Sequence, residues 1–270
     1  MTQQPDFTPP PTSEHRLVYQ RELDDLTKGV IRLGAMACET IPRGTEALLT
    51  GNLADAQTVI DEDDAIDALT LQLEEQCVSI IALQAPMAGD LRRLLTVIKL
   101  VAEIERSADL VVNICKASRR MYGSELSPAI RGLVASMSRE ANKLLRLSID
   151  AFADSNDSLA AALNDIDDEL DQLNRDMVEA IFAAHNEDAI NLAGAVQLAL
   201  ISRYYERIGD HAVNIGERVI YMVTGWTPEH LGMMRANMRA DNGEDGDNPD
   251  PGEVDDASGL SDGYHDPSED

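Results

Sequence analysis

Two pairs of acidic residues stand at a spacing that suits cation binding. Glu105 precedes Asp109 by four positions, and Glu206 precedes Asp210 by the same interval. On a helix, residues four apart lie one above the other on one face, so each pair presents two carboxylates together. Such like charges repel by roughly a few tenths of a kcal/mol unless a cation offsets them. Each pair is therefore either a metal site or part of a solvated acidic face.

The segments that carry these pairs are copies of one another. Residues 103–114 align without gaps on residues 204–215, and both contain Glu-Arg, then Asp, then Asn-Ile, at a constant offset of 101 residues. A unit of this length is too long for a solenoid repeat and matches a small helical bundle. The pattern indicates an internal duplication, which favours a metal site over a solvated face.

Further carboxylates precede each pair by some 40 residues. They are Asp61, Asp63, Asp64 and Asp67 in the first half, and Asp165, Asp167, Asp168 and Asp171 in the second. If these segments flank the pairs, oxygen-rich clusters form, which suit Mg, Mn, Ca or Fe better than the thiolate and imidazole sites typical of Zn. The predicted metal ligands are Glu105, Asp109, Glu206, Asp210, Asp64, Asp67, Asp168 and Asp171.

Apolar residues recur at helical spacing through most of the chain, and short breaks divide them into six segments. The expected helices cover residues 14–49, 53–85, 90–122, 130–152, 159–184 and 189–223, although Pro42 and Gly44 weaken the middle of the first. The sequence predicts an all-α fold of two tandem three-helix bundles. The first bundle spans residues 14–123 and the second residues 124–225. Residues 1–13 and an acidic tail, 226–270, are predicted to be disordered.

The composition excludes several classes of protein. The formal charge is −27, which opposes binding to nucleic acid phosphates. Residues 226–270 hold 13 acidic and two basic side chains, so much of this charge lies in the predicted tail. No secretory signal or apolar run long enough for a membrane span is present. Three widely spaced cysteines, Cys38, Cys77 and Cys115, fit reduced thiols, and we expect a soluble cytoplasmic protein.

Catalysis has little support in the sequence. No histidine follows a glutamate by three positions, as in di-iron carboxylate bundles, and no nucleophile elbow or Gly-rich phosphate loop occurs. We interpret His211, next to Asp210, as a packing or hydrogen-bonding residue. We expect a protein that is not an enzyme. A carboxylate-bridged metalloenzyme of the helical-bundle type is the alternative, and a metal-free helical scaffold is a third reading.

At these residues the sequence resembles the PhoU family of phosphate-specific transport accessory proteins. The family signature Glu-Arg-Ile-Gly-Asp-His-x-x-Asn-Ile stands at residues 206–215, with a degenerate copy at 105–114. The run that precedes the third helix in the family also appears, at residues 80–93. The resemblance covers about residues 16–225. The first copy departs from the signature with Ser107, Ala108 and Leu110, but it keeps the Glu105 and Asp109 pair.

The resemblance implies a fold and a function. Family members are pairs of three-helix bundles, cytoplasmic and often dimeric, which bind metal clusters through the Glu-x-x-x-Asp pairs. Iron, manganese and magnesium are the expected ions, and zinc is a further candidate. The family implies a negative regulator of the phosphate-starvation response, which connects the ATPase of the phosphate ABC transporter with a sensor histidine kinase. We therefore expect a homodimer that reaches the membrane through these partners.

Overall fold

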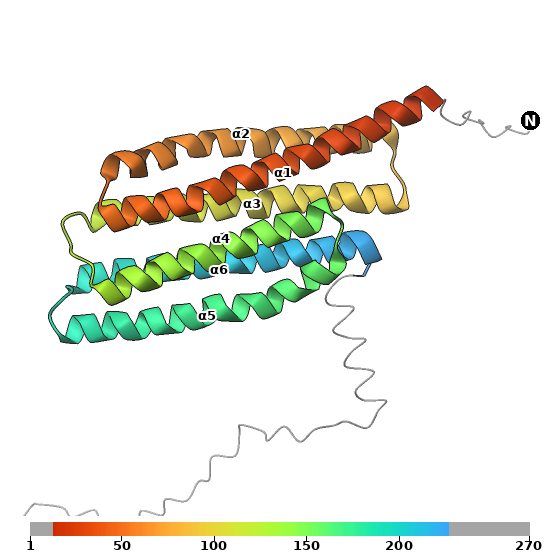
Figure 1. The fold of residues 1–270 in the computed structure, drawn as a ribbon. Helices are drawn as coiled ribbons and strands as arrows, with labels where there is room; N and C mark the ends of the chain where they lie inside the picture. Colours follow the sequence, from red (N-terminus) through yellow and green to blue (C-terminus); the bar gives the residue numbers. More distant parts are fainter. Residues whose placement is uncertain (1–12, 227–270) are drawn as a thin grey trace, which may run out of the picture. The chain divides into compact units, whose positions relative to one another are not determined.

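The structure is a computed structural model that describes residues 13–226, and within them it contains six α-helices and no strand (Figure 1). The helices are α1 (Ser13–Thr50), α2 (Leu53–Gln84), α3 (Ala88–Arg120), α4 (Pro128–Ala153), α5 (Asp157–Asn186) and α6 (Leu192–Thr224). The all-α prediction is confirmed. The predicted disorder of residues 1–12 and 227–270 lies outside the described residues.

Polar caps and glycines set most of the helix boundaries. The side chain of Asn52 accepts hydrogen bonds from the first turn of α2, and the Ser127 hydroxyl caps α4 just before its proline. Gly51 and Gly225 take positive φ angles of 67° and 79° where α1 and α6 end, a conformation that costs glycine little. The last helix starts three residues later than predicted because Asn191 accepts a hydrogen bond from the backbone of the first turn of α6.

Helix α1 passes through its predicted weak point without a break. Pro42 lies inside the continuous helix, where it removes one backbone donor. Gly44 allows close packing against α3, because a Cβ atom there would lie 2.6 Å from Val111 Cγ1. Tertiary packing of α1 therefore outweighs the local cost of the proline.

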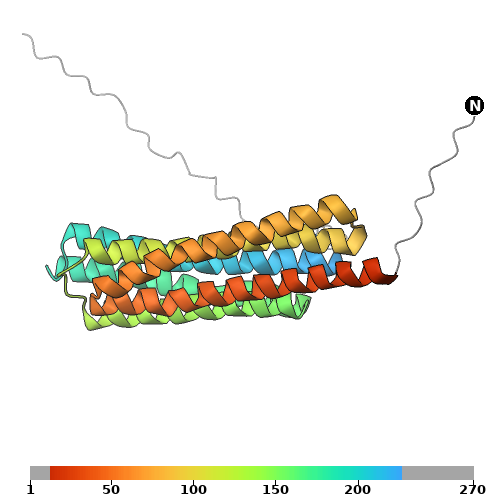
Figure 2. The ribbon, with the colours of Figure 1, turned by 90° about the horizontal axis from the view of Figure 1, so that it is seen from above.

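The six helices form two three-helix repeats within one compact unit (Figures 1 and 2). Helix α3 packs on α6, and α1 packs on α4, whereas the described parts of α2 and α5 contact only helices of their own repeat. The predicted boundary between residues 123 and 124 falls in the loop between α3 and α4. Two three-helix repeats in tandem are confirmed, and their cores join through these two helix pairs.

Buried positions show the duplication directly. Most buried residues of α2 recur in α5 104 positions later, as in the pairs 59/163, 66/170 and 77/181. Those of α3 recur in α6 101 positions later, as in 97/198, 104/205 and 111/212. Equivalent residues of the two repeats can therefore be compared one by one.

Three hydroxyls tie the two repeats together in the core. Thr45 Oγ1 of α1 donates to Ser138 Oγ of α4, and it lies 2.7 Å from the Tyr205 hydroxyl of α6. All three side chains are buried, and burial raises the pKa of Tyr205. These hydrogen bonds satisfy polar groups that burial would otherwise penalise.

Candidate metal-binding site

The first group of carboxylates lies where α2 packs on α3, and we call Asp63, Asp67, Glu105 and Asp109 the first cluster. The pKa of Asp63 is raised to about 6, first by burial and then by the charges of Asp109 and Asp67. The pKa of Glu105 is raised by burial and then by Asp109 and Asp67. Carboxylates from both helices therefore lie close enough to repel one another.

The second cluster, Asp167, Asp171, Glu206 and Asp210, repeats this arrangement where α5 packs on α6. The pKa of Asp167 is raised to about 6, first by burial and then by the charges of Asp171, Asp210 and Glu206. Burial and the charge of Asp210 raise the pKa of Glu206, which is only 8% exposed. In both clusters the buried or half-buried members have raised pKa values, so their negative charge is unfavourable there and a cation would relieve it.

The structure brings six of the eight predicted ligands into these clusters. The other two, Asp64 and Asp168, are exposed, as are Asp67 and Asp109 of the first cluster. After burial and the carboxylates of each cluster, the charges of Asp64 and Asp168 add to the raised pKa values of Asp67 and Asp167. The preceding residues Asp63 and Asp167 are half-buried. Successive helical residues differ in direction by about 100°, so a shift of one position moves a side chain out of a helix contact. The missed signal is spacing, since Asp63 precedes Asp67 by four residues, as Asp167 precedes Asp171.

The two helices of the second cluster approach each other closely. Ser202, Gly209 and Gly216 follow one line on α6, and a Cβ atom on Gly209 would lie 2.3 Å from Asp167 Oδ1. The equivalent residues of α3 are the larger Val101, Ala108 and Cys115.

Two oxygens of the second cluster are buried and lack partners. Asp167 Oδ1 and Glu206 Oε2 are inaccessible to solvent and accept no hydrogen bond, whereas Glu206 Oε1 accepts one from Arg203 Nη1. Buried carboxylate oxygens without donors are costly. A hard cation would satisfy both, so the donor chemistry of this cluster fits a metal ion.

The side chains are not arranged around a single point. Within residues 13–226 no three histidine, cysteine, aspartate or glutamate side chains are grouped so that they could hold one ion as they lie. Mutual repulsion keeps uncompensated carboxylates apart. Metal binding would therefore require some of these side chains to rotate toward a shared ion.

His211 points away from the second cluster and into the contact between α3 and α6. Its Nδ1 lies 3.2 Å from the Glu103 carbonyl oxygen and 3.4 Å from Ser107 Oγ. Burial lowers its pKa below the usual value, although the Glu103 carboxylate opposes this. The geometry agrees with a packing and hydrogen-bonding role.

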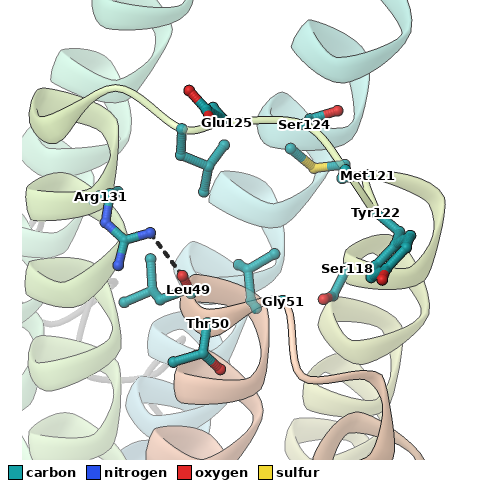
Figure 3. Close-up of a pocket in the computed structure, with 12 residues that line it drawn as sticks. Leu49, Thr50, Gly51, Ser118, Met121, Tyr122, Ser124, Glu125 and Arg131 are labelled. Carbon is teal, nitrogen blue, oxygen red and sulfur yellow. Dashed lines mark hydrogen bonds between the residues drawn. The ribbon is translucent and has the colours of Figure 1, made fainter.

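A cavity of about 610 Å³ lies away from both clusters, at the end of the bundle where α1 and α3 stop (Figure 3). The loop between the repeats supplies Tyr122 and Glu125, and α4 supplies Arg131. Arg131 Nη1 donates a 2.6 Å hydrogen bond to the Leu49 carbonyl oxygen. This arginine joins the end of α1 to α4.

Comparison with known proteins defines the class to which this duplicated helical fold belongs. The model of the PhoU domain matches residues 30–118 and 134–219, one match in each repeat. The chain therefore belongs to the PhoU family. Homolog 1 of the phosphate-specific transport system accessory protein PhoU from Mycobacterium tuberculosis is 33% identical over 214 residues, 79% of this chain and 96% of that protein. The Clostridium acetobutylicum homolog is 30% identical over 211 residues, which are 78% of this chain and 96% of that protein.

Solved structures support the same assignment. PhoU from Pseudomonas aeruginosa superposes with a TM-score of 0.72 at 27% identity and covers 77% of this chain and 100% of its own. The phosphate transport system regulatory protein PhoU from Streptococcus pneumoniae gives a TM-score of 0.71 at 25% identity. This match covers 77% of this chain and 98% of the other. The family resemblance seen in the sequence is confirmed.

Proposed function

We propose that this chain is an accessory regulator of phosphate transport that represses the phosphate-starvation response. The observation that carries the proposal is the match of both repeats to the PhoU domain. The relatives support it, because this chain matches them over almost their full length. Those relatives are named as accessory or regulatory proteins of phosphate transport. These names favour a regulator over the carboxylate-bridged metalloenzyme.

The proposed partners are the ATPase of the phosphate ABC transporter and a sensor histidine kinase, which the chain would contact from the cytoplasm. Support comes from the relatives, whose names tie them to the transport system. No helix within residues 13–226 is both long and apolar enough to cross a membrane.

The proposed metal ions serve the structure of this regulator. The first cluster would bind a cation through Glu105 and Asp109 with Asp63 and Asp67, and the second through Glu206 and Asp210 with Asp167 and Asp171. A bound cation neutralises the carboxylates and ties two helices of a repeat together. The unpartnered oxygens of Asp167 and Glu206 and the raised pKa values support this role. Iron, manganese and magnesium suit these oxygen donors, and zinc remains a candidate.

We also propose a homodimer. Exposed apolar side chains occur on both sides of the turn between α5 and α6, with Phe182 at 65% exposure near the end of α5 and Leu192 at 68% and Val196 at 49% near the start of α6. Large exposed apolar side chains in one area are typical of protein contacts. Light scattering on the purified full chain should give the mass of two chains; the mass of one chain would exclude a stable homodimer.

Deletion of the gene tests the proposed function. A phosphate-starvation reporter should become active in phosphate-replete cells that lack the chain, and the intact gene should restore repression. A reporter that stays silent after deletion would overturn the proposal.

A further inference from the structure

The contact between α3 and α6 contains a small pocket that is lined by cations and by no carboxylate. Its volume is about 240 Å³, and the lining residues are Leu95, Thr96, Lys99, Arg218 and Tyr221. The first three stand on α3, and the other two stand on the last turns of α6. Thr96 is 1% exposed, and its Oγ1 donates to the Arg218 carbonyl oxygen at 3.5 Å. The pocket is therefore built from two helices that are joined at its wall.

The charge of this pocket is opposite to that of the chain. The chain has a formal charge of −27, and four larger cavities, of about 610, 480, 270 and 270 Å³, each have at least one carboxylate in their lining. Within residues 13–226 the ion pairs involve other side chains, and none includes Lys99 or Arg218. Two cations that stay unpaired in so acidic a chain are available to an external anion.

The neighbouring acids on α3 and α6 do not fill the pocket. Glu103 lies one turn beyond Lys99 on α3, and its Oε1 is paired with Arg106 Nη1 at 3.3 Å. Glu217 precedes Arg218 directly, but successive helical residues differ in direction by about 100°, and Glu217 does not line the pocket. The lining therefore has a formal charge of +2, from one lysine and one arginine.

The duplication places a different set of side chains at the equivalent position of the same helix contact. With the offset of 101 residues, the counterparts of the lining residues are Val196, Gln197, Leu200, Ala117 and Arg120. The one cation of this set, Arg120, donates from Nη1 to Gln197 Oε1 at 3.4 Å. Leu200 stands in the place of Lys99. The pair of cations is therefore a property of one end of the contact and not of the repeated fold.

We propose that this pocket binds a phosphate group. Near pH 7 a phosphate group carries a charge of about −1.5 to −2, which balances the two cations, whereas a carboxylate balances only one. The planar guanidinium of Arg218 can donate two parallel hydrogen bonds to phosphate oxygens, and the ammonium of Lys99 acts as a point charge. Tyr221 adds a hydroxyl, and Leu95 adds an apolar edge.

The size of the pocket limits the ligand. Drug-sized molecules occupy pockets of about 300–1,000 Å³, so this smaller pocket suits inorganic phosphate or a small phosphate monoester. The inference goes beyond the proposed function, because the charges of the pocket define the site and family membership does not. It also does not depend on bound metal.

Nuclear magnetic resonance of the full chain tests this directly after chelator treatment, which leaves no metal to bind the anion. Inorganic phosphate is added at pH 7.5 and constant ionic strength, and acetate is the matched carboxylate control. Phosphate should shift the amide signals of Leu95, Thr96, Lys99, Arg218 and Tyr221 and saturate at a Kd on the order of 1 mM. Acetate should bind at least about tenfold more weakly. Absent shifts, or equal binding of acetate, would overturn the proposal.

A second titration with glycerol 3-phosphate distinguishes the two sources of a phosphate group. Tighter binding of inorganic phosphate would identify the ion itself as the ligand. Equal or tighter binding of the ester would identify a small organic phosphate. Both results support a phosphate site, whereas failure of both compounds to shift the five signals would exclude it.

Three variants locate the site. Lys99→Gln and Arg218→Gln should each weaken phosphate binding at least about tenfold, because each removes a charge-assisted contact. Arg120→Gln removes the same charge from the opposite end of the contact between α3 and α6, and it should change the affinity by less than about twofold. Equal weakening by all three variants would show a general charge effect and contradict the assignment. None of these results decides the outcome of the gene deletion, so failure of the pocket and failure of the proposed function are distinguishable.

Discussion

Arg203 donates a hydrogen bond from Nη1 to Oε1 of Glu206, so the second carboxylate cluster carries a cation on its own helix. The arginine side chain is 55% exposed and that of Glu206 is 11% exposed. Even with this partner, burial and the charge of Asp210 keep the pKa of Glu206 raised. The cluster is therefore only partly neutralised and can still attract a metal ion, for which Arg203 is a built-in competitor.

Removal of this competitor should strengthen metal binding. We expect Arg203→Gln to raise the affinity of the second cluster for Mn²⁺ by roughly twofold to fivefold, because an exposed ion pair contributes about 0.5–1 kcal/mol. Calorimetric titration would measure this in a chain with Glu105→Gln and Asp109→Asn, which removes the repeated pair of the first cluster. Arg139→Gln, which removes an exposed arginine bonded to Ser136, is the control. Affinity that falls or stays constant in Arg203→Gln would contradict the competitor role.

Gly209→Ala should destabilise the chain. A Cβ atom there would lie 2.3 Å from Asp167 Oδ1 and 2.8 Å from Leu170 Cδ2, so these side chains or the backbone of α5 must shift. We expect the free energy of unfolding to fall by about 1–3 kcal/mol, measured by urea denaturation. Gly132→Ala is a matched control, because it lies inside α4 with no atom within 4 Å of the new Cβ. It should stabilise by about 0.5–1 kcal/mol, and an equal response of both variants would refute the close approach of α5 and α6.

The metal-free chain should lose stability as pH rises through about 6. The pKa values of Asp63 and Asp167 are raised to about 6 from 3.8, so the folded chain binds more protons than the unfolded chain between these values. The two carboxyl groups therefore stabilise the folded chain fully below pH 3.8, their pKa in the unfolded chain. This stabilisation is lost as pH rises through about 6, their pKa in the folded chain.

Asparagine at one of these positions should remove part of this pH dependence. After allowance for solvent screening, Asp167→Asn should stabilise the metal-free chain by about 1–2 kcal/mol at pH 7.5 and have little effect at pH 4. Thermal or urea unfolding at both pH values measures this change in stability. The control Asp168→Asn, at an exposed position, should change the stability little at either pH. Stabilisation that is the same at pH 4 and pH 7.5 would show that the carboxylate charge is not its cause.

Tyr205→Phe should weaken the contact between the repeats. Its hydroxyl lies 2.7 Å from Thr45 Oγ1 in the core, and a buried hydrogen bond contributes about 1–2 kcal/mol. The exposed Tyr122→Phe is the control, because its ring is 69% exposed. If the two variants unfold at the same urea concentration, the hydroxyl network does not hold the repeats together.

The sequence predicted the helices well because caps and breaks are local. Five of the six helices begin and end within two residues of the expected positions, and α6 begins three residues later than expected. Gly51 and Asn52 separate α1 from α2, as expected. One helix over residues 14–49 was expected with a weak middle, and the long-range contact of Gly44 with Val111, 67 residues away, could not be read from the local sequence.

The clusters were predicted less completely than the helices. The repeated pairs Glu105 with Asp109 and Glu206 with Asp210 stood out because both members lie on one helix and recur at one offset. Whether Asp63 or Asp64 faces the neighbouring helix depends on the rotation of α2, and in the sequence only the four-residue spacing from Asp67 favours Asp63.

Metal content of the purified chain tests the central claim most directly. Elemental analysis of the full chain, purified without chelator, should find bound iron, manganese or another divalent metal. Glu206→Ala with Asp210→Ala should remove the metal of the second cluster, and the further changes Glu105→Ala and Asp109→Ala should remove the rest. Replacement of the exposed Asp64 and Asp168 by alanine should leave the ratio of metal to protein unchanged. A folded chain without metal, or the same ratio in all variants, would contradict the account.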